Sequence, residues 1–263
     1  MELFSSREVK KILQKHRIYP SKGLGQNFLI DKGVLKRVIS AADLKKEDTV
    51  LEIGPGIGVL TLELAKKVKK VVSVEKDPRM CIVLRGLLEG QKIKNVELIN
   101  ADILKLNLNN YKLRAKNYKL VANLPYYIVA PVIRKFLERE YRPSLMILMA
   151  QKEVAQRICA KPPKMNLLAV SVQFYAEPKI ISFVSKNSFW PEPKVDGAII
   201  KITPLINADN KLINADLFFK IAQAGFSQPR KQLINNFSKA LKLNKIEIES
   251  ILKSCRIRPD QRA

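Results

Sequence analysis

The stretch that decides the fold is Thr49-Val50-Leu51-Glu52-Ile53-Gly54-Pro55-Gly56-Ile57-Gly58. It begins with a short, mostly apolar run and ends in a turn that contains three glycines. An apolar run without polar alternation is typical of a parallel strand that is covered on both faces. Glycines after such a strand let the backbone turn sharply into a helix and approach a ligand closely. The stretch therefore predicts a strand, a ligand-binding turn and a helix over residues 59–67.

Similar apolar runs recur along the chain, and segments with helical spacing separate them. The predicted strands are 49–53, 70–75, 95–100, 118–122 and 145–150, and the predicted helices are 31–42, 59–67, 77–88 and 131–139. Alternation of strands and helices of these lengths argues for a doubly wound α/β domain. Asp31 is the expected N-cap of its helix, and a short basic helix over 7–16 precedes it.

The pattern changes after Lys152. A helix is expected over 153–160, strands over 167–175 and 198–203, and beyond Pro204 only short helices, over 216–224, 228–241 and 246–253. We therefore predict two domains, an α/β domain over 1–205 that includes the N-terminal basic helix, and a small basic α-helical domain over 206–263. The chain stops at Arg262-Ala263 without a terminal helix cap, so the second domain is expected to be cut short.

The charge of the chain predicts a polyanionic partner. Lysine and arginine number 48 against 24 aspartates and glutamates, which gives a formal net charge of +24. The apolar fraction of 47% is ordinary for a packed globular protein and excludes wholesale disorder. Such a basic excess points first to nucleic acid and second to an acidic membrane surface. A lysine-rich proteome, which would raise the charge of every protein, is the alternative explanation.

Cysteine and histidine usage limits the chemistry. Cys81, Cys159 and Cys255 are isolated and show neither a disulfide framework nor metal-ligand spacing, so a reducing compartment is expected. His16 is the single histidine, which excludes most zinc sites and any Ser–His mechanism near the middle of the chain; no metal is expected. The charged N-terminus and the lack of a long apolar run predict a cytoplasmic protein without a membrane association.

The glycine turn favours one cofactor over another. A dinucleotide fingerprint needs Gly-x-Gly-x-x-Gly, but residue 59 is valine, so the third glycine that lets the helix fit a pyrophosphate is missing. Gly54-Pro55-Gly56-Ile57-Gly58 is more typical of S-adenosylmethionine sites, where no phosphate is bound. A glycine turn without any ligand is the alternative at this point.

Two carboxylates follow the next two predicted strands. Glu75 lies 21 residues after Gly54, where an acidic side chain can accept hydrogen bonds from both ribose hydroxyls. Its alternative role is a solvated carboxylate paired with Lys76. Asp102 can accept a hydrogen bond from an adenine amino group, or it can cap a helix. Both carboxylates and the glycine turn lie at carboxyl ends of successive strands, the edge at which open α/β sheets bind ligands.

Asn123-Leu124-Pro125-Tyr126 follows the fourth predicted strand and suits methylation of an amine on a planar base. The Asn123 side-chain oxygen and a neighbouring backbone carbonyl can accept hydrogen bonds from the exocyclic amine. Pro125 fixes the turn, and Tyr126 offers a ring on which a base can stack. No strong general base is needed, because the methylated amine sheds its proton to water. An ordinary strand-to-turn sequence is the alternative interpretation of these four residues.

At this point the chain resembles the KsgA-type family of small-subunit (16S) ribosomal RNA adenine dimethyltransferases, which are relatives of the Erm methylases. Six ordered segments over essentially the whole chain carry the resemblance: 26–29, 52–58, 123–126, 151–157, 189–196 and 226–233. The chain departs from the usual family pattern in having Val129-Ala130 where Ser-Thr is usual, and in lacking a glycine over 161–166. The resemblance implies a Rossmann-like class I methyltransferase domain, followed by a small helical domain.

The resemblance also implies a reaction and a set of site residues. Two methyl groups would pass from S-adenosylmethionine to each of two adjacent adenines near the 3′ end of 16S rRNA, during assembly of the 30S subunit. The expected catalytic residues are Asn123, Tyr126 and Phe189; the expected cofactor contacts are Asn27, Leu29, Gly54, Glu75, Asp102 and Asn123. Tyr126 and Phe189 would hold the two faces of the adenine.

Basic residues cluster over 7–22 and 152–164 and at Arg230-Lys231. We expect these clusters to form one surface that docks folded RNA through its phosphates. The expected RNA-binding residues are Lys22, Lys152, Arg157, Arg230 and Lys231, and the protein is expected to act as a monomer.

Three other functions stay open at this stage. An Erm-like enzyme would modify 23S rRNA by the same chemistry, but Leu124 and Tyr126 favour the small-subunit interpretation over the Ile and Phe usual in Erm proteins. A non-catalytic RNA-binding assembly factor could keep the fold, although the intact Asn123 and Tyr126 argue against it. A nicotinamide-dependent oxidoreductase is the most distant alternative.

Overall fold

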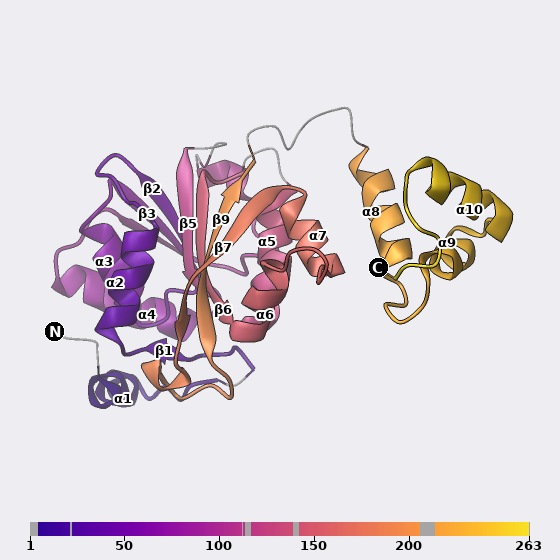
Figure 1. The fold of residues 1–263 in the computed structure, drawn as a ribbon. Coiled ribbons are helices and arrows are strands. Elements are labelled where there is room, and N and C mark those ends of the chain that lie inside the picture. The colour runs from indigo at the N-terminus through magenta and orange to yellow at the C-terminus, as the bar shows by residue number, and fades with distance from the viewer. Residues whose placement is uncertain are drawn as a thin grey trace. The chain divides into compact units, whose positions relative to one another are not determined.

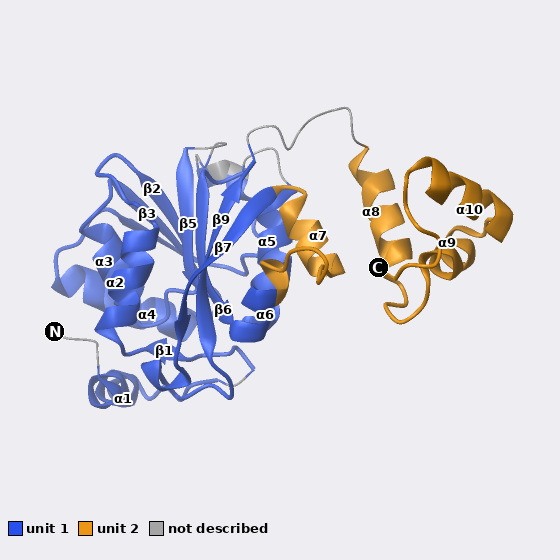
Figure 2. Ribbon diagram, in the orientation of Figure 1, with its two compact units in different colours: residues 1–156, 176–205 blue, residues 157–175, 206–263 orange. Residues whose placement is uncertain are grey.

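The computed structural model describes residues 5–21, 23–111, 113, 117–138, 142–205 and 214–262. The chain divides into two compact units, one of residues 1–156 with 176–205, and one of residues 157–175 with 206–263 (Figure 2). A single boundary near residue 205 was expected, with all earlier residues in the first domain. In the structure, residues 157–175 group instead with the C-terminal helices. Residue 206 itself lies outside the described residues.

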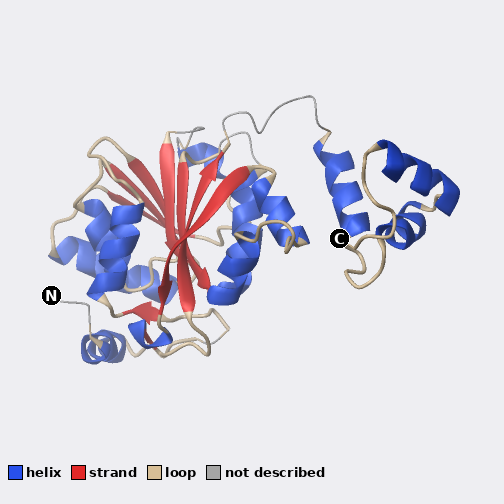
Figure 3. Ribbon diagram, in the orientation of Figure 1, coloured by secondary structure: helices blue, strands red, loops and turns tan. Residues whose placement is uncertain are grey.

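A seven-stranded sheet forms the centre of the first unit (Figures 1 and 3). In spatial order its strands are β4 (Val96–Asn100), β3 (Lys70–Glu75), β2 (Thr49–Ile53), β5 (Tyr118–Asn123), β6 (Leu145–Gln151), β9 (Gly197–Pro204) and β7 (Ala176–Val184). The first five strands are parallel, whereas β9 runs antiparallel to both β6 and β7. The predicted α/β class is confirmed, and the five predicted parallel strands all form.

The strand order reverses at β2, and this reversal positions the site. Leu51 of β2 lies between Val72 of β3 on one side and Leu120 of β5 on the other. The chain therefore leaves β2 and β5 in opposite directions, which opens a crevice beyond the carboxyl ends of these two strands. The glycine turn follows β2 and Asn123 ends β5, so both flank the crevice.

Helices cover both faces of the sheet. Figure 1 shows α2 (Lys32–Ala41), α3 (Val59–Ala65) and α4 (Pro78–Gly90) on one side and α5 (Val129–Leu137) on the other. Asp31 begins α2 by accepting hydrogen bonds from the amides of Gly33 and Val34, as its residue type predicts. Fully buried apolar side chains from α2 to α4 pack on this face of the sheet, and burial of each such side chain contributes about 1.5–3 kcal/mol.

A second, two-stranded sheet joins distant parts of the chain. β1 (Phe28–Leu29) pairs antiparallel with β8 (Phe189–Trp190), so Leu29 lies opposite Phe189. Ser188, which ends the short helix η3 (Lys186–Ser188), donates a hydrogen bond to Asp31 over 2.8 Å. The loop before α2 and the loop before β9 are therefore fixed to each other.

The N-terminal helix α1 (Ser6–Lys15) packs on the same unit. It buries Val9, Ile12 and Leu13, and Ser5 caps it by accepting a hydrogen bond from the Glu8 amide. The Lys10 ammonium lies 5.5 Å from the centre of the Trp190 ring, a cation–π contact that links α1 to β8. Two further short helices complete the connections, η1 (Leu108–Tyr111) and η2 (Tyr126–Ile128), and α6 (Lys152–Ile158) follows β6.

The strand expected over 167–175 is wrong, because residues Leu167–Gln173 form the helix α7. Asn166 caps this helix by accepting a hydrogen bond from the Ala169 amide. The strand that pairs with β9 is instead β7, which the sequence did not predict. The β-branched residues in Leu167-Leu168-Ala169-Val170-Ser171-Val172 favour a strand locally, and packing of the helix overrides that weak preference.

The second unit is helical, as predicted for the C-terminal part. It contains α7, α8 (Ala215–Gly225), α9 (Leu233–Leu241) and α10 (Lys245–Ser254). Aromatic packing joins residues that are distant in sequence, since Phe174 stacks on Phe218 with ring centres 4.4 Å apart. This stacking is the physical reason why residues 157–175 belong with the C-terminal helices. Within the described residues, no helix is long and apolar enough to span a membrane.

Candidate active site

The glycine turn takes a conformation that other residues rarely adopt. Gly54, Gly56 and Gly58 have φ angles of 68°, 56° and 90°, in the left-handed region that favours glycine. Space is also limiting, because a Cβ atom on Gly58 would lie 2.5 Å from a methyl carbon of Leu84. The turn therefore depends on glycine for its backbone angles and for its packing on α4.

Glu75 anchors the turn. One carboxylate oxygen accepts a hydrogen bond from the Gly56 amide over 3.1 Å, and the other accepts one from the Asp77 amide over 2.8 Å. Burial raises the pKa of Glu75 above its ordinary value, although these amide hydrogen bonds oppose the shift. The alternative of a solvated Glu75 paired with Lys76 is wrong, since Glu75 is 8% exposed and Lys76 pairs with Asp102.

Asp102 follows β4, the strand that neighbours β3 in the sheet. Its Oδ2 accepts from the Lys76 ammonium over 3.0 Å, and its Oδ1 accepts from the Leu104 amide over 2.9 Å. These bonds lower the pKa of Asp102 in spite of partial desolvation. Asp102 thus caps the turn that follows it and also lines the cavity.

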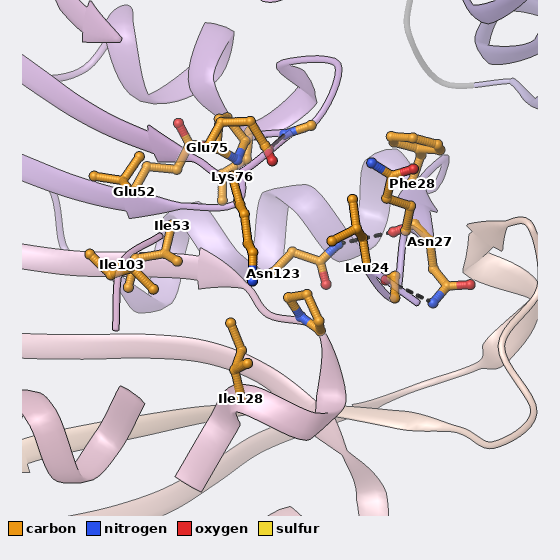
Figure 4. A pocket seen from close by; sticks show the side chains of 18 of the residues that line it. Leu24, Asn27, Phe28, Glu52, Ile53, Glu75, Lys76, Ile103, Asn123 and Ile128 are labelled. Carbon is orange, nitrogen blue, oxygen red and sulfur yellow. Dashed lines mark hydrogen bonds between the residues drawn. The ribbon is translucent and has the colours of Figure 1, made fainter. Parts of the chain in front are cut away.

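A cavity is lined by the glycine turn, Glu75, Asp102 and Asn123, which come from four strand ends. Figure 4 shows Lys76 extending from the end of β3 along this cavity, and shows Asn123 facing the loop that carries Asn27. The structure therefore brings together all the residues expected to contact the cofactor: Asn27, Leu29, Gly54, Glu75, Asp102 and Asn123. Three further residues line the cavity and were not predicted as site residues: Lys76, Tyr127 and Ile103, each a direct chain neighbour of a predicted residue.

Glu52 is a buried carboxylate in the wall of this cavity. It is 1% exposed, and its Oε2 accepts a hydrogen bond from the Ser73 hydroxyl over 2.5 Å. Burial raises the pKa of Glu52 to about 7, against an ordinary value of 4.5. The Ser73 and Thr61 hydroxyls oppose this rise, and the nearby Glu75 carboxylate adds to it.

The raised pKa of Glu52 predicts a pH-dependent stability. The folded protein holds this proton up to about pH 7 while the unfolded chain releases it near 4.5, so stability is lost as pH rises through this interval. Between pH 4.5 and 8, this titration should lower the free energy of unfolding of the wild type by about 3 kcal/mol. Glu52→Gln has no proton to release at this position and should not show this decrease. Urea unfolding at several pH values measures the free energy of unfolding of both proteins. Glu89→Gln, a change at an exposed site on α4, should keep the wild-type pH dependence, and equal slopes for wild type and Glu52→Gln would contradict the prediction.

The loop before α2 closes one side of the cavity. Gly25 has a φ angle of 61°, and a Cβ there would lie 2.9 Å from the Pro125 Cβ, so the loop and the Asn123–Tyr126 segment are in close contact. The Gln26 amide donates a hydrogen bond to Asp77, the N-cap of α4, over 2.9 Å. The Asn123 amide nitrogen donates to the Asn27 carbonyl oxygen over 3.3 Å (Figure 4). This bond directs the remaining acceptor, Oδ1 of Asn123, away from the loop.

A second cavity adjoins the first. Tyr126, Gln151 and Phe189 line only this second cavity, whereas Asn27 and Asn123 line both. Phe189 is held there by the pairing of β8 with β1, and it is 5% exposed. Burial, together with the Asp196 carboxylate, raises the pKa of Tyr126. The structure therefore brings the three expected catalytic residues, Asn123, Tyr126 and Phe189, to one cavity.

The expected RNA-binding residues fall into different parts of the chain. Lys152 directly follows Gln151, and its ammonium lies 5.1 Å from the centre of the Phe183 ring. Arg157, Arg230 and Lys231 belong to the second unit. Lys22 lies outside the described residues. Within the part of the chain that the structure describes, no group of three or more histidine, cysteine, aspartate and glutamate side chains could hold a metal ion.

Comparison with known proteins decides the family. The family model described as ribosomal RNA adenine dimethylase matches residues 20–262. The chain belongs to the ribosomal RNA adenine dimethylase family. Ribosomal RNA small subunit methyltransferase A of Dehalococcoides mccartyi strain BAV1 is 43% identical, over 97% of this chain and 87% of that protein. The protein of the same name from Clostridioides difficile is 38% identical over 97% of this chain and 89% of its own.

Solved structures of dimethylases share the fold. A dimethyladenosine transferase from Plasmodium falciparum has a TM-score of 0.73 and 29% identity, over 88% of this chain and 83% of that chain. The 23S rRNA methyltransferase ErmE has a TM-score of 0.70 and 26% identity, over 89% and 92%. The predicted class I methyltransferase domain with C-terminal helices is thereby confirmed. As a member of the adenine dimethylase family, the chain is an S-adenosylmethionine-dependent methyltransferase of ribosomal RNA.

The first cavity fits this methyl donor. Because the glycines of the turn carry no side chains, its backbone can lie close to a ligand. Space at Gly56 is limited as well, since a Cβ there would lie 3.2 Å from the Phe28 ring. Glu75 and Asp102 present carboxylate oxygens, which suit ribose hydroxyls and an adenine amine as hydrogen-bond donors. The residues present are therefore compatible with S-adenosylmethionine in chemistry and in position.

Proposed function

We propose that the protein methylates the exocyclic amines of two adjacent adenosines near the 3′ end of 16S rRNA, giving dimethyladenosines during assembly of the 30S subunit. The relatives named small subunit methyltransferase A, which match nearly the full chain, support the choice of RNA. The observation that carries the proposal is the meeting of two cavities at Asn27 and Asn123. One cavity is lined for the cofactor, the other is lined by aromatic rings for a base, and a methyl group must cross from one to the other.

In this proposal the first cavity holds the cofactor. Glu75 accepts hydrogen bonds from the ribose hydroxyls, Asp102 accepts one from the adenine amine, and the backbone of Gly54, Asn27 and Leu29 surrounds the remainder. When bound, S-adenosylmethionine supplies an electrophilic methyl group on its sulfonium. The Asp77 and Gly56 amides hold Glu75 in place before any ligand arrives, which limits the entropy cost of binding.

The second cavity then holds the target adenine. Tyr126 and Phe189 stack on its two faces, which replaces the stacking that the base had within the RNA. Asn123 accepts a hydrogen bond from the exocyclic amine at its Oδ1, because its amide nitrogen is already engaged by the Asn27 carbonyl. Acceptance at Oδ1 directs the amine lone pair toward the cofactor cavity. The proton that the amine releases on methylation goes to water.

Basic residues of both units would hold the RNA. Arg7 and Lys15 are exposed cations of α1, the helix that packs on Trp190, which is the neighbour of Phe189. Arg17 is exposed in the turn that follows this helix. Lys152 follows a residue that lines the base cavity. Together with Lys22, Arg157, Arg230 and Lys231 they would neutralise phosphates of the folded rRNA. We further propose that the protein acts as a monomer in the cytoplasm, where ribosomal subunits are assembled.

The proposal is tested with particles that lack the modification. Purified protein and tritium-labelled S-adenosylmethionine are incubated with undermethylated 30S particles, and dimethyladenosine is mapped by primer-extension stops. We expect stops at two adjacent adenosines near the 3′ end of 16S rRNA. Label in 23S rRNA instead would establish the Erm-like alternative, and RNA binding without label in either RNA would establish a non-catalytic assembly factor.

Tyr126 gives a prediction on the base cavity. Tyr126→Ala should raise KM for the RNA substrate or lower kcat by about tenfold to a hundredfold, because one stacking face contributes roughly 1–3 kcal/mol. Its affinity for S-adenosylhomocysteine, measured by calorimetry, should stay at the wild-type value. Ile82→Ala, at a side chain of α4 that is 61% exposed, is the control and should change neither quantity. Equal reductions of cofactor affinity and turnover would show that Tyr126 is only structural. Phe189 is tested as Phe189→Leu, because alanine at this buried site would also cost stability.

A further inference from the structure

We infer that Lys76 is a positioning residue that makes the cofactor cavity selective for an adenine amino group over a 6-oxo group. The inference rests on the proposed hydrogen bond between Asp102 and the adenine amine. The carboxylate of Asp102 is held at both oxygens, Oδ1 by the Leu104 amide and Oδ2 by the Lys76 ammonium. A carboxylate fixed at two points has its remaining lone pairs in fixed directions.

The main chain of Lys76 is itself held rigidly. The Asn100 amide donates hydrogen bonds to the carbonyl oxygens of Glu75 over 2.9 Å and Lys76 over 3.3 Å. The Glu75 carboxylate on the preceding residue is bound to the Gly56 and Asp77 amides. Lys76 thus starts from an ordered strand end, and Figure 4 shows its side chain extended along the cavity.

The loop that carries Asp102 is supported from α5. Lys135 of that helix donates hydrogen bonds to the carbonyl oxygens of Ile103, over 2.5 Å, and Leu106, over 2.9 Å. Ile103 is 4% exposed and lines the cavity. The backbone around Asp102 is therefore fixed without Lys76, and the specific contribution of Lys76 is to the carboxylate.

The salt bridge from Lys76 has two chemical consequences. Its hydrogen bond and charge lower the pKa of Asp102, which moves the loss of the ionised acceptor to lower pH; near neutral pH the carboxyl is ionised in either case and can only accept hydrogen bonds. An ionised acceptor binds the amino group of adenine and repels the 6-oxo group of hypoxanthine. Because the Lys76 hydrogen bond occupies one direction at Oδ2, the amine of the ligand can donate to this oxygen only from the remaining directions. A donor that approaches from elsewhere forms a weak hydrogen bond. Lys76 therefore acts on recognition through Asp102 and need not touch the ligand.

The experiment compares two ligands by calorimetry at pH 7.5, S-adenosylhomocysteine and its deaminated analogue S-inosylhomocysteine. The discrimination ratio is the Kd of the inosine ligand divided by the Kd of the adenosine ligand. We expect Lys76→Met, which keeps the length of the stem, to lower this ratio about fivefold to tenfold, as expected for a weakened charge-assisted hydrogen bond. Lys76→Arg should restore most of the ratio. Lys105→Met removes a lysine from the same loop and should leave the ratio unchanged, because the Lys105 side chain acts on Asp102 through its charge alone and does not fix the direction of the carboxylate.

A second readout is the pH dependence of binding. Removal of the Lys76 ammonium raises the pKa of Asp102, so the decline of S-adenosylhomocysteine affinity on acidification should begin at higher pH in Lys76→Met than in wild type. Besides Lys76, the charged group that acts on Asp102 is Lys105, which stays in place.

Asp102→Asn separates the inference from the proposal beneath it. In one outcome, Asp102→Asn lowers the ratio, whereas Lys76→Met keeps the wild-type ratio and the wild-type pH at which affinity begins to decline. This outcome overturns the role of Lys76 and leaves the assignment of Asp102 standing. If neither variant changes the ratio, Asp102 does not bind the adenine amine, and the inference falls with that assignment. If both lower the ratio and Lys76→Met has no further effect on Asp102→Asn, the two residues act as one unit and the inference is supported.

Discussion

Methyl transfer is expected to fall by a hundredfold or more in Asn123→Ala, while the fold changes little. Asn123 ends β5 and lines both cavities, so it is the side chain placed where the methyl group crosses. Removal of an acceptor that acts in a desolvated site costs on the order of 3 kcal/mol in the transition state. Single-turnover transfer of labelled methyl to undermethylated 30S particles measures the rate without a contribution from product release.

The control for this prediction is Asn187→Ala, which removes the same functional group from an exposed position on η3. It should keep the wild-type rate. Asn123→Ala also removes the hydrogen bond to the Asn27 carbonyl, so Asn123→Asp is a useful second variant: it retains an acceptor but cannot donate to Asn27. Thermal unfolding should show all three variants folded. Turnover of Asn123→Ala within a few-fold of wild type would remove Asn123 from the mechanism.

The second large effect concerns the docking of RNA. Arg7→Gln, Lys15→Gln and Arg17→Gln combined should weaken binding to 30S particles at least about tenfold at low salt, because each neutralised phosphate releases condensed counterions on binding. The slope of log affinity against log salt should become shallower by up to about 0.9 for each duplex phosphate that the variant no longer neutralises. These three side chains are exposed, and the helix that precedes Arg17 is packed on Trp190 through Lys10.

A triple variant of equal charge change is available as the control. Lys67, Lys69 and Lys94 are exposed and lie before β3 and β4, at the amino ends of these parallel strands. This is the edge of the sheet opposite to the glycine turn. Their replacement by glutamine should leave the affinity and the slope close to wild type. If both triple variants weaken binding equally, the cations of α1 contribute only general charge, and the positive surface reflects a lysine-rich composition.

Much of the α/β unit could be predicted from the sequence, since its signals are local. The apolar run 49–53 stops at three glycines, and Asp31 precedes its helix as an N-cap. Each of these features depends on a few neighbouring residues, so it is readable without knowledge of the fold. The carboxyl ends of successive parallel strands also share one edge of a sheet by geometry. That rule alone predicted that the glycine turn, Glu75, Asp102 and Asn123 would meet.

Other features depend on residues far apart in the chain, and only the tertiary structure decided them. The pairing of Leu29 with Phe189 completes the base cavity, but two-residue strands carry no periodicity that a sequence could show. The salt bridge of Lys76 to Asp102, in place of one to Glu75, follows from the burial of Glu75 against the glycine turn. A strand was predicted over 167–175, yet residues 167–173 form a helix that leads into the stacking of Phe174 on Phe218. In each case local preference amounts to a few tenths of a kcal/mol per residue, whereas burial of one large side chain contributes about 1.5–3 kcal/mol, so packing between distant segments prevails.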